Sequence, residues 1–557
     1  MRTMLSCLLL VVASMTAIAA DAPPSADLII HNARIYTVDP VRPRVSALAI
    51  RDGRIVFAGS DRAAQAFRGA KTRLHDLAGK TVIPGMIDAH AHLLGLGLGL
   101  QQVELRGSRS FDEVIARVRT RAAEVAPGGW IIGRGWDQND WADTRFPSHE
   151  ALSAALPAHP VLLTRVDGHA GIANALAMQR AGINADSKDP AGGRIERDKQ
   201  GAPTGVLIDS ALDNAERAVP ALAESDRRAA VLAAIAELNR WGLTGVHDAG
   251  VARSTIETYK SLAAAGRYNL RNYVMIAGDD ATLDHYLARG PQRGLAQQRL
   301  WISAIKLSAD GALGSRGAAL LEPYADDPGN NGLDLLPAGR IRAVALRALD
   351  TGFQLNTHAI GDRANRTVLD ELSQALDKHP VADHRFRIEH AQILHPEDIP
   401  RFAELGVIPS MQASHQTSDM YWVGNRVGAT RELGSYAWRS LLDTGVIIPN
   451  GSDLPVEQSN PLISFKAAIS RQDQNDWPAG GWHPEQRMSR EEALRSITLW
   501  PAYAAFMEHE VGSLSPGKLA DFVVLDQDIM RVASAQILAT GVLETWLGGR
   551  KVYPATD

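Results

Sequence analysis

Cysteine is almost absent from this sequence. Its 557 residues include a single cysteine, Cys7, which lies in an N-terminal segment that we expect to be removed on export. A mature chain without a thiol can form no disulfide bond and has no cysteine nucleophile. The sequence also lacks a GxSxG nucleophile elbow and a P-loop, so no motif supports a serine hydrolase or nucleotide-dependent chemistry.

Neither sign of charge is in large excess. The chain has 58 Lys and Arg against 63 Asp and Glu, a formal net charge of −5. This mild acidity gives no reason to expect a nucleic acid or an anionic membrane as partner, so we expect a small-molecule substrate. The length and the 45% hydrophobic content predict a large core and more than one structural unit. The composition leaves a homodimer open.

The N-terminal segment has the parts of a secretory signal. Arg2 precedes an apolar run over residues 4–12, and small residues follow up to Ala20. The run is too short to span a membrane, and it continues beyond Cys7, so we expect neither a membrane anchor nor a lipoprotein anchor. We therefore predict a signal peptide over residues 1–20 and an exported protein, either periplasmic or secreted.

Two histidines follow an apolar run over residues 81–87. His90 and His92 are two positions apart, and side chains with that spacing point the same way from a β-strand. Both imidazoles could therefore ligate one metal ion. By themselves they could equally be a surface pair or hydrogen-bonded core groups. Further metal-ligating residues at the ends of other strands would favour the metal-site interpretation of this pair.

Short strands with tight turns are predicted at both ends of the chain. Near the N-terminus, Asp52 and Gly53 join two strand-like runs, and a Gly-Gly turn at 548–549 follows another such run near the C-terminus. We predict that residues 21–84 and 509–557 pair into a small β-sandwich domain that brackets the middle of the chain.

The middle of the chain alternates strand-like runs with Ala-rich helical stretches, a pattern typical of βα units around a parallel sheet. We predict an α/β fold, a (β/α)8 TIM-like barrel over residues 85–508. The section 101–240 is longer than one βα unit, which predicts an inserted subdomain after the first barrel strand, over the mouth of the barrel.

Four further strand-like runs end at or near a residue that can ligate a metal: Lys306, His358, His390 and Asp453. The C-terminal strand ends of a barrel face one mouth, so these residues and the opening histidine pair predict a two-metal site. A protonated lysine has no lone pair for a cation, but reaction with carbon dioxide would give Lys306 a carbamate whose two oxygens can bridge two ions. Strand alternation predicts that Glu389 points away from His390.

With these residues in this order, the chain resembles the amidohydrolase superfamily of metal-dependent hydrolases. Within it, the resemblance is to the amidohydrolase-3 branch, which includes YtcJ-like proteins and N-substituted formamide deformylase, and it covers nearly all of the mature chain. The motifs that carry it are GMIDAHAH at 85–92, DGHA at 167–170, KLSADGALGSRG at 306–317, HAIGDRA at 358–364, RIEHAQ at 387–392 and GSDLPVE at 451–457.

The resemblance implies a role for each of the six positions. His90 and His92 match the first-strand ligands of the more buried metal, Lys306 matches a carboxylated bridging lysine, and His358 and His390 match the ligands of a second metal. Asp453 matches an aspartate that ligates the first metal and also carries the proton. The implied cofactor is one or two divalent ions, of which Zn²⁺ is the expected one.

The expected reaction is hydrolysis of a non-peptide C–N bond by metal-activated water, in an amide or an N-substituted formamide. Asp453 would act as general base and then as general acid. Hydrolysis of cyclic amides, carbamates or lactones is the alternative, and a non-catalytic secreted binding protein on the same barrel is a further one.

Six other residues are candidate substrate contacts, each with a structural alternative. His169 belongs to a family motif, but it could be a structural hydrogen-bonding group. Trp136 could line the pocket or pack inside an aromatic loop, and His247 could face the mouth or be a satisfied core histidine. Asp310 and Arg316 lie in a Gly-rich loop that could hold the carbamate or the substrate. His415 could face the mouth from another strand end.

Overall fold

The computed structural model describes residues 24–555. The predicted signal peptide over residues 1–20 and Cys7 lie outside this range. Among the described residues, no helix is both long and apolar enough to cross a membrane.

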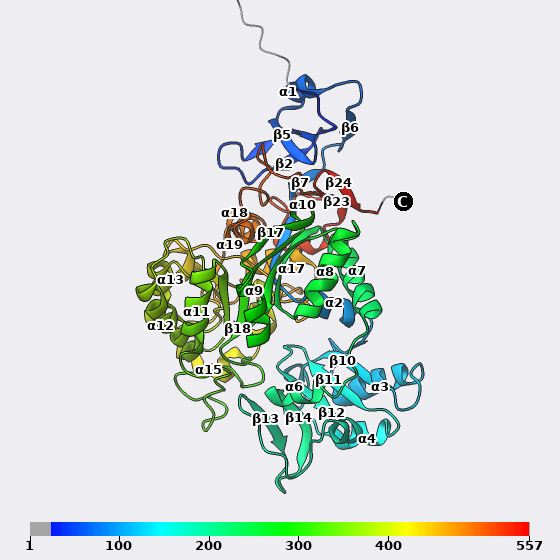
Figure 1. Ribbon diagram of the computed structural model, residues 1–557, viewed down its shortest axis with the longest axis vertical. Helices are drawn as coiled ribbons and strands as arrows, with labels where there is room; N and C mark the ends of the chain where they lie inside the picture. Colours follow the sequence, from blue (N-terminus) through cyan, green and yellow to red (C-terminus); the bar gives the residue numbers. More distant parts are fainter. Residues whose placement is uncertain (1–23, 556–557) are drawn as a thin grey trace, which may run out of the picture.

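The centre of the molecule is a parallel sheet curved into a barrel (Figure 1). Its hydrogen-bonded neighbours, in order, are β8 (Met86–Ala91), β15 (Leu243–Val251), β16 (Arg271–Ala277), β18 (Leu300–Ser308), β19 (Gln354–Ala359), β20 (Arg387–His390) and β21 (Ile408–Ser410). The strands are almost wholly buried, as expected for a parallel sheet that is covered by helices. The predicted α/β barrel is therefore confirmed.

An irregular segment, residues 449–454, fills the eighth strand position. Its Asn450 bridges to Met411 after β21, and its Leu454 bridges to Ala91 at the end of β8, both in parallel. The amide of His92 donates to the carbonyl oxygen of Leu454 at 2.8 Å, and the amide of Asp453 donates to the carbonyl oxygen of His90 at 2.7 Å. These bonds close the barrel and bring Asp453 beside the first strand.

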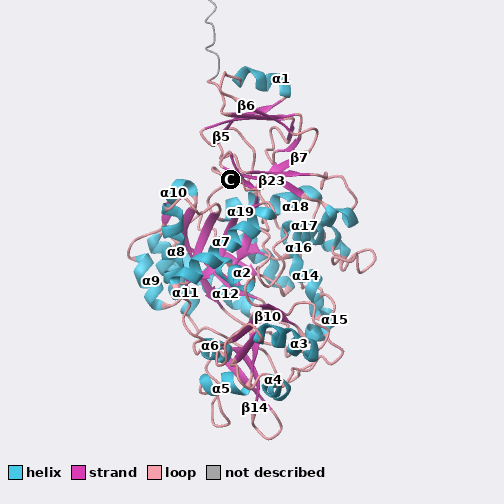
Figure 2. Cartoon of the chain, turned by 90° about the vertical axis from the view of Figure 1, so that its right-hand side faces the viewer, coloured by secondary structure: helices cyan, strands magenta, loops and turns pink. Residues whose placement is uncertain are grey.

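Helices surround the barrel, among them α7 (Glu224–Arg240), α8 (Arg253–Ala264), α11 (Arg340–Thr351), α12 (Asp362–Lys378) and α17 (Pro461–Ser470) (Figure 2). A short helix, α2 (Leu93–Gly99), packs against α7. A Cβ atom at Gly97 would lie 2.0 Å from the carbonyl oxygen of Ala230, so only glycine allows this close approach. The alternating leucines and glycines of residues 94–99 thus form a helix that packs closely on α7.

Two sheets lie beyond one end of the barrel, the first built from N-terminal strands and the second from strands of both chain ends (Figure 1). The first sheet has the order β5-β4-β1-β6, with β1 (Leu28–His31), β4 (Ala47–Arg51), β5 (Arg54–Gly59) and β6 (Arg73–Asp76). The second has the order β24-β23-β22-β7-β2-β3, with β2 (Arg34–Tyr36), β3 (Arg44–Val45), β7 (Thr81–Pro84), β22 (Phe522–Leu525), β23 (Val542–Leu547) and β24 (Arg550–Tyr553). Ile50, Val82 and Phe522 share one hydrophobic cluster, so the two sheets enclose a common core.

A separate subdomain lies at the opposite end of the barrel (Figure 1). Its sheet has the order β13-β14-β12-β11-β10-β9, with β9 (Val103–Glu104), β10 (Ile131–Trp136), β11 (Val161–Arg165), β12 (Ala170–Ala173), β13 (Gly193–Arg197) and β14 (Pro203–Asp209). The predicted insertion extended to about residue 240. In the structure α7 packs on α2 and β15 of the barrel, so the inserted fold ends before Glu224.

Candidate metal centre and substrate cavity

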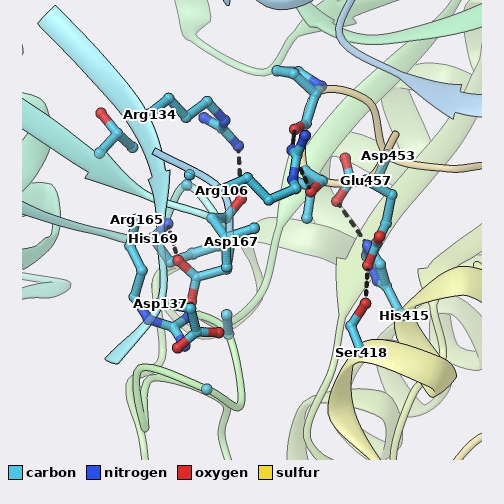
Figure 3. A pocket seen from close by; sticks show the side chains of 18 of the residues that line it. Arg106, Arg134, Asp137, Arg165, Asp167, His169, His415, Ser418, Asp453 and Glu457 are labelled. Atoms are coloured by element: carbon cyan, nitrogen blue, oxygen red, sulfur yellow. Dashed lines mark hydrogen bonds and ion pairs between the residues drawn. The ribbon is translucent and has the colours of Figure 1, made fainter. Parts of the chain in front are cut away.

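A cavity of about 1010 Å³ lies between the C-terminal ends of the barrel strands and the inserted subdomain. Figure 3 shows side chains from both parts around it. All six predicted metal ligands line this cavity: His90, His92, Lys306, His358, His390 and Asp453. The barrel topology brings them together because each follows a parallel strand or the segment that takes the eighth position.

Asp453 lies at the centre of the imidazole cluster. Ligand atoms of His90, His390 and Asp453 all lie within 4.8 Å of one another. The Oδ1 atom of Asp453 is 3.0 Å from Nε2 of His92 and 3.6 Å from Nε2 of His90. This oxygen is buried and has no hydrogen-bond partner among the described residues.

Each of the four histidines has one ring nitrogen occupied by the protein. Nδ1 of His90 is 2.5 Å from Oε2 of Glu389, Nδ1 of His92 is 3.1 Å from the carbonyl oxygen of Ala249, and Nδ1 of His390 is 2.7 Å from Oε1 of Gln412. For these three rings the remaining nitrogen is Nε2. In His358 the arrangement is reversed, because Nε2 lies 3.3 Å from Oδ1 of Asp310 and Nδ1 remains. Such outer contacts fix the orientation of metal-binding imidazoles.

Burial favours the neutral form of His90, His358 and His390. Burial and the nearby charge of Lys306 lower the pKa of His90 to about 4. Burial, together with His358 and His90, lowers the pKa of His390 well below its ordinary value, and burial also lowers the pKa of His358. A neutral imidazole offers the lone pair that a metal requires, whereas an imidazolium repels it.

Lys306 is a buried amine beside the same cluster. Its Nζ atom is 3.4 Å from Nε2 of His90, and no carboxylate among the described residues lies within ion-pair distance of it. Burial lowers the pKa of Lys306, against the opposing charges of Glu389 and Asp453.

The donor set fits a divalent metal ion. Three to four imidazole nitrogens and a carboxylate oxygen are ligands that zinc and related ions prefer. The buried Asp453 Oδ1 atom makes no hydrogen bond within the described chain although it lies 3.0 Å from Nε2 of His92, and a purely structural cluster would leave this contact unexplained.

Glu389, which was predicted to point away from His390, contacts a different ligand. Its carboxylate lies between the His90 ring and the Arg387 guanidinium, whose Nε is 2.7 Å from Oε1 of Glu389. Burial alone raises the pKa of Glu389, but Arg387 and His90 lower it to about 2. The backbone of His390 has φ +74°, outside strand geometry, so strict alternation ends one residue too early for the prediction.

His169 and His415 do line the cavity. Nδ1 of His169 is 2.7 Å from Oδ1 of Asp209, and the His169 and His358 ring centroids are 5.2 Å apart. Burial alone lowers the pKa of His169, but its hydrogen bond to Asp209 and the charges of Asp209 and Asp167 raise it to about 9. The His415 ring is stacked on that of His390 at 5.8 Å, with Nε2 3.8 Å from Oδ2 of Asp453.

Trp136 does not line the cavity, contrary to the prediction. It is fully buried in the core of the inserted subdomain, where its indole nitrogen donates to the carbonyl oxygen of Leu163 at 2.8 Å. In a regular strand, Arg134 and Trp136 would point to the same face of the sheet. A register shift in β10 at Gly135, which has φ +106°, makes them point to opposite faces. Arg134 therefore lines the cavity and Trp136 enters the core.

Three more predicted contacts lie behind or beside the cavity wall. His247 is buried under the metal ligands, where Arg387 donates to its Nδ1 at 2.9 Å. Asp310 is buried and accepts hydrogen bonds from the amides of Ala319, Ile360 and Gly361, so it shapes the loop and contacts His358 rather than the substrate. Arg316 forms an ion pair with Asp326 at 3.0 Å.

Several residues of the site were not predicted from the sequence. Gln412 orients His390, and the inserted subdomain adds Arg106, Arg134, Arg165 and the two carboxylates that pair with Arg165, Asp137 and Asp167. Asp167 opens the DGHA motif at 167–170, whereas the other residues lie in none of the motifs that carry the family resemblance.

Comparison with known proteins gives consistent results. Protein LONG AFTER FAR-RED 3 from Arabidopsis thaliana is 36% identical to this chain, over 96% of this chain and 93% of the plant protein. Putative amidohydrolase YtcJ from Bacillus subtilis is 32% identical over 94% and 98%, and N-substituted formamide deformylase from Arthrobacter pascens is 29% identical over 95% and 99%. The crystal structure of an uncharacterized metal-dependent hydrolase from Pyrococcus horikoshii superposes with a TM-score of 0.74 at 27% identity, covering 91% of this chain and 99% of that one.

The family resemblance seen in the sequence motifs is confirmed. The profile of the amidohydrolase family matches residues 73–553, which include the whole barrel, the insertion and about half of the strands of the β-domain. This protein belongs to the amidohydrolase family.

Proposed function

We propose that the protein hydrolyses a non-peptide C–N bond of a small amide or N-substituted formamide. The observation that carries this proposal is the buried Asp453 carboxylate, held among neutral imidazoles at the floor of a cavity large enough for a small molecule. Asp453 combines a metal-binding atom and a proton acceptor at one position, a combination that catalysis needs and binding alone does not.

His90, His92 and Asp453 would hold a first divalent ion, for which we propose Zn²⁺, and His358 and His390 would hold a second. When bound, such an ion polarises a substrate carbonyl and lowers the pKa of a coordinated water towards about 7. We further propose that Lys306 carries a carbamate that joins the two positions. A neutral Nζ forms a bond to the carbon of CO₂ and releases one proton, and a buried amine without a carboxylate partner suits this reaction.

The remaining steps follow from the protein's own groups. Asp453 takes a proton from the attacking water and delivers it to the departing nitrogen, so that an amine leaves rather than an amide anion. His169 presents Nε2 to the cavity, since Nδ1 is occupied by Asp209, and it can donate a hydrogen bond to the substrate. The inserted subdomain covers the mouth and restricts access of bulk water.

The similarity to N-substituted formamide deformylase supports an acyclic amide over the alternatives. Cyclic amides, carbamates and lactones need the same attack on a carbonyl carbon, and substrate choice depends on the cavity walls rather than on the metal ligands. The predicted signal peptide leads us to propose an exported protein, which periplasmic fractionation of cells that express the full chain would test.

The proposal is tested by metal content and turnover together. Protein prepared with added zinc and bicarbonate is expected to hold stoichiometric metal and to hydrolyse members of a panel of N-formyl, N-acyl amino acid, cyclic amide and lactone substrates. Chelation should abolish turnover, and zinc should restore it. Stoichiometric metal without hydrolysis of any substrate in the panel would favour the binding-protein alternative, and the absence of bound metal would refute the proposed site.

A further inference from the structure

Arg134 is a cationic side chain in the wall of the cavity. It lies on β10 of the inserted subdomain, and its guanidinium packs against Gly168 in the turn that precedes His169. A Cβ atom at Gly168 would lie 3.2 Å from Nη2 and 3.4 Å from Nη1 of Arg134. The absence of a side chain at Gly168 thus gives the guanidinium its place at the cavity.

Arg134 has no counter-charge of its own. Its Nη2 atom donates to the carbonyl oxygen of Val166 at 3.0 Å, and this is its one hydrogen bond within residues 24–555. Nε is buried without a partner, and no carboxylate of the described chain lies within 4.0 Å of the guanidinium. The charges of Asp453, Asp167 and Glu216 act on Arg134 from around the cavity, but none of these three carboxylates forms an ion pair with it.

Arg165, the neighbouring arginine of the same wall, is the opposite case. It is ion-paired with Asp137, and its Nη1 atom is 2.5 Å from Oδ2 of Asp167. Arg106 donates Nη2 to the carbonyl oxygens of Pro455 and Val456, at 2.6 and 3.0 Å. An arginine that is largely withdrawn from water without a partner is costly, so proteins normally pair it, as they do Arg165.

The position of Arg134 relative to the metal centre suits a bound anion. Figure 3 shows Arg134 and Arg106 on one side of the cavity, with Glu457 and Ser418 on the other side and Asp453 above them. Ser418 donates to Glu457 at 2.6 Å, so that side already carries negative charge. The charge of Asp453 acts on Arg134 across the cavity. A ligand with its scissile amide at Asp453 can therefore extend an anionic group towards Arg134, away from Glu457.

We propose that Arg134 binds a carboxylate of the substrate, and that the substrates are therefore amides of N-acyl amino acid type rather than neutral amides. This inference rests on the proposed function, because it assumes that the scissile amide lies at Asp453. Arginine presents several donors in a plane that matches a carboxylate, and only Nη2 of Arg134 has a hydrogen-bond partner among the described residues.

The test compares charged and neutral substrates in matched variants. Metal-loaded wild-type protein and Arg134→Gln are assayed with N-acetyl amino acids and with their terminal carboxamides, following release of the acetyl group. We expect kcat/KM of Arg134→Gln to fall by about 10- to 100-fold for the carboxylates, mainly through KM, and to change little for the carboxamides. Arg145→Gln is the control, since Arg145 is an exposed arginine of the same insertion and is paired with Asp143.

Equal losses for both substrate types, or no preference of the wild type for carboxylates, would overturn the proposal. Arg134→Lys keeps the charge and should recover part of the preference, which separates loss of charge from misfolding. If no substrate is hydrolysed, the proposed function fails separately. Calorimetric titration with the N-acetyl amino acids and their carboxamides then still decides the subsite, because carboxylate-selective binding must weaken in Arg134→Gln and persist in Arg145→Gln.

Discussion

The two walls of the cavity are built differently. On the barrel side, every imidazole is held by a second contact, such as Glu389 behind His90 and Gln412 behind His390. On the insertion side, one arginine is fully paired and the next, Arg134, is left with free donors towards the cavity. The ligand imidazoles of the barrel wall are thus oriented by neighbouring side chains, whereas the Arg134 guanidinium in the insertion wall has one hydrogen bond within the described residues.

This difference suggests a division of roles: the barrel wall supplies the reacting groups, and the insertion wall selects the substrate. The C-terminal strand ends of a barrel fix reacting groups to a rigid scaffold, whereas segments inserted between strand and helix vary the surroundings of the same centre. We therefore expect changes on the barrel wall to alter turnover or metal affinity for every substrate. Changes on the insertion wall should alter which substrate is used, as the Arg134 comparison tests.

The largest expected effect is that of Asp453→Asn. Asparagine keeps an oxygen that can face the metal but cannot accept the proton, so kcat should fall by about 10²- to 10⁴-fold for charged and neutral substrates alike. Turnover and metal content are measured on the same preparation. Asp443→Asn, an exposed aspartate beside α16 (Trp438–Leu442), should behave as wild type. Retained metal with undiminished turnover in Asp453→Asn would refute the proton role.

Trp136→Ala tests whether the insertion is a separate unit. Removing this buried ring from the core of the insertion should cost about 3–5 kcal/mol of its stability. Denaturation followed by circular dichroism, with limited proteolysis between residues 101 and 216, should show earlier loss of the insertion. Metal content should persist, because the ligands belong to the barrel. Trp477→Ala is the control, since Trp477 is 47% exposed. Simultaneous loss of metal would show that the two walls are not independent.

Gln412→Leu gives the smallest of these effects. The substitution removes the acceptor that orients Nδ1 of His390 without creating a buried charge. Metal affinity, measured by competition with a chromogenic chelator, should fall by about 10- to 100-fold. Gln179→Leu on the exposed side of α5 (Ala175–Arg180) serves as control. Unchanged affinity would mean that the contact behind His390 does not tune the site.

The sequence predicted the barrel and the convergence of six residues at one cavity because one rule covers them. Each residue lies at the end of an apolar run, and the parallel strands of a barrel all end at one mouth. The topology alone therefore predicted that the six residues lie close together. The rule failed where local geometry departs from a regular strand. The positive φ of His390 takes that residue out of strand geometry, so alternation did not separate Glu389 from the ligand cluster, and the register shift at Gly135 sent Trp136 into the core. Neither irregularity has a reliable pattern in a single sequence.

What the sequence determined by itself was the set of reactive groups and their order along parallel strands, because residue type and hydrophobic periodicity are local properties. The tertiary structure alone decided which nitrogen of each histidine faces the site, that residues 449–454 close the barrel beside His90, and that Arg134 reaches the cavity without a carboxylate. These outcomes depend on contacts between residues that are far apart in the chain, such as His90 with Glu389, and only the packed fold brings such pairs within hydrogen-bond distance.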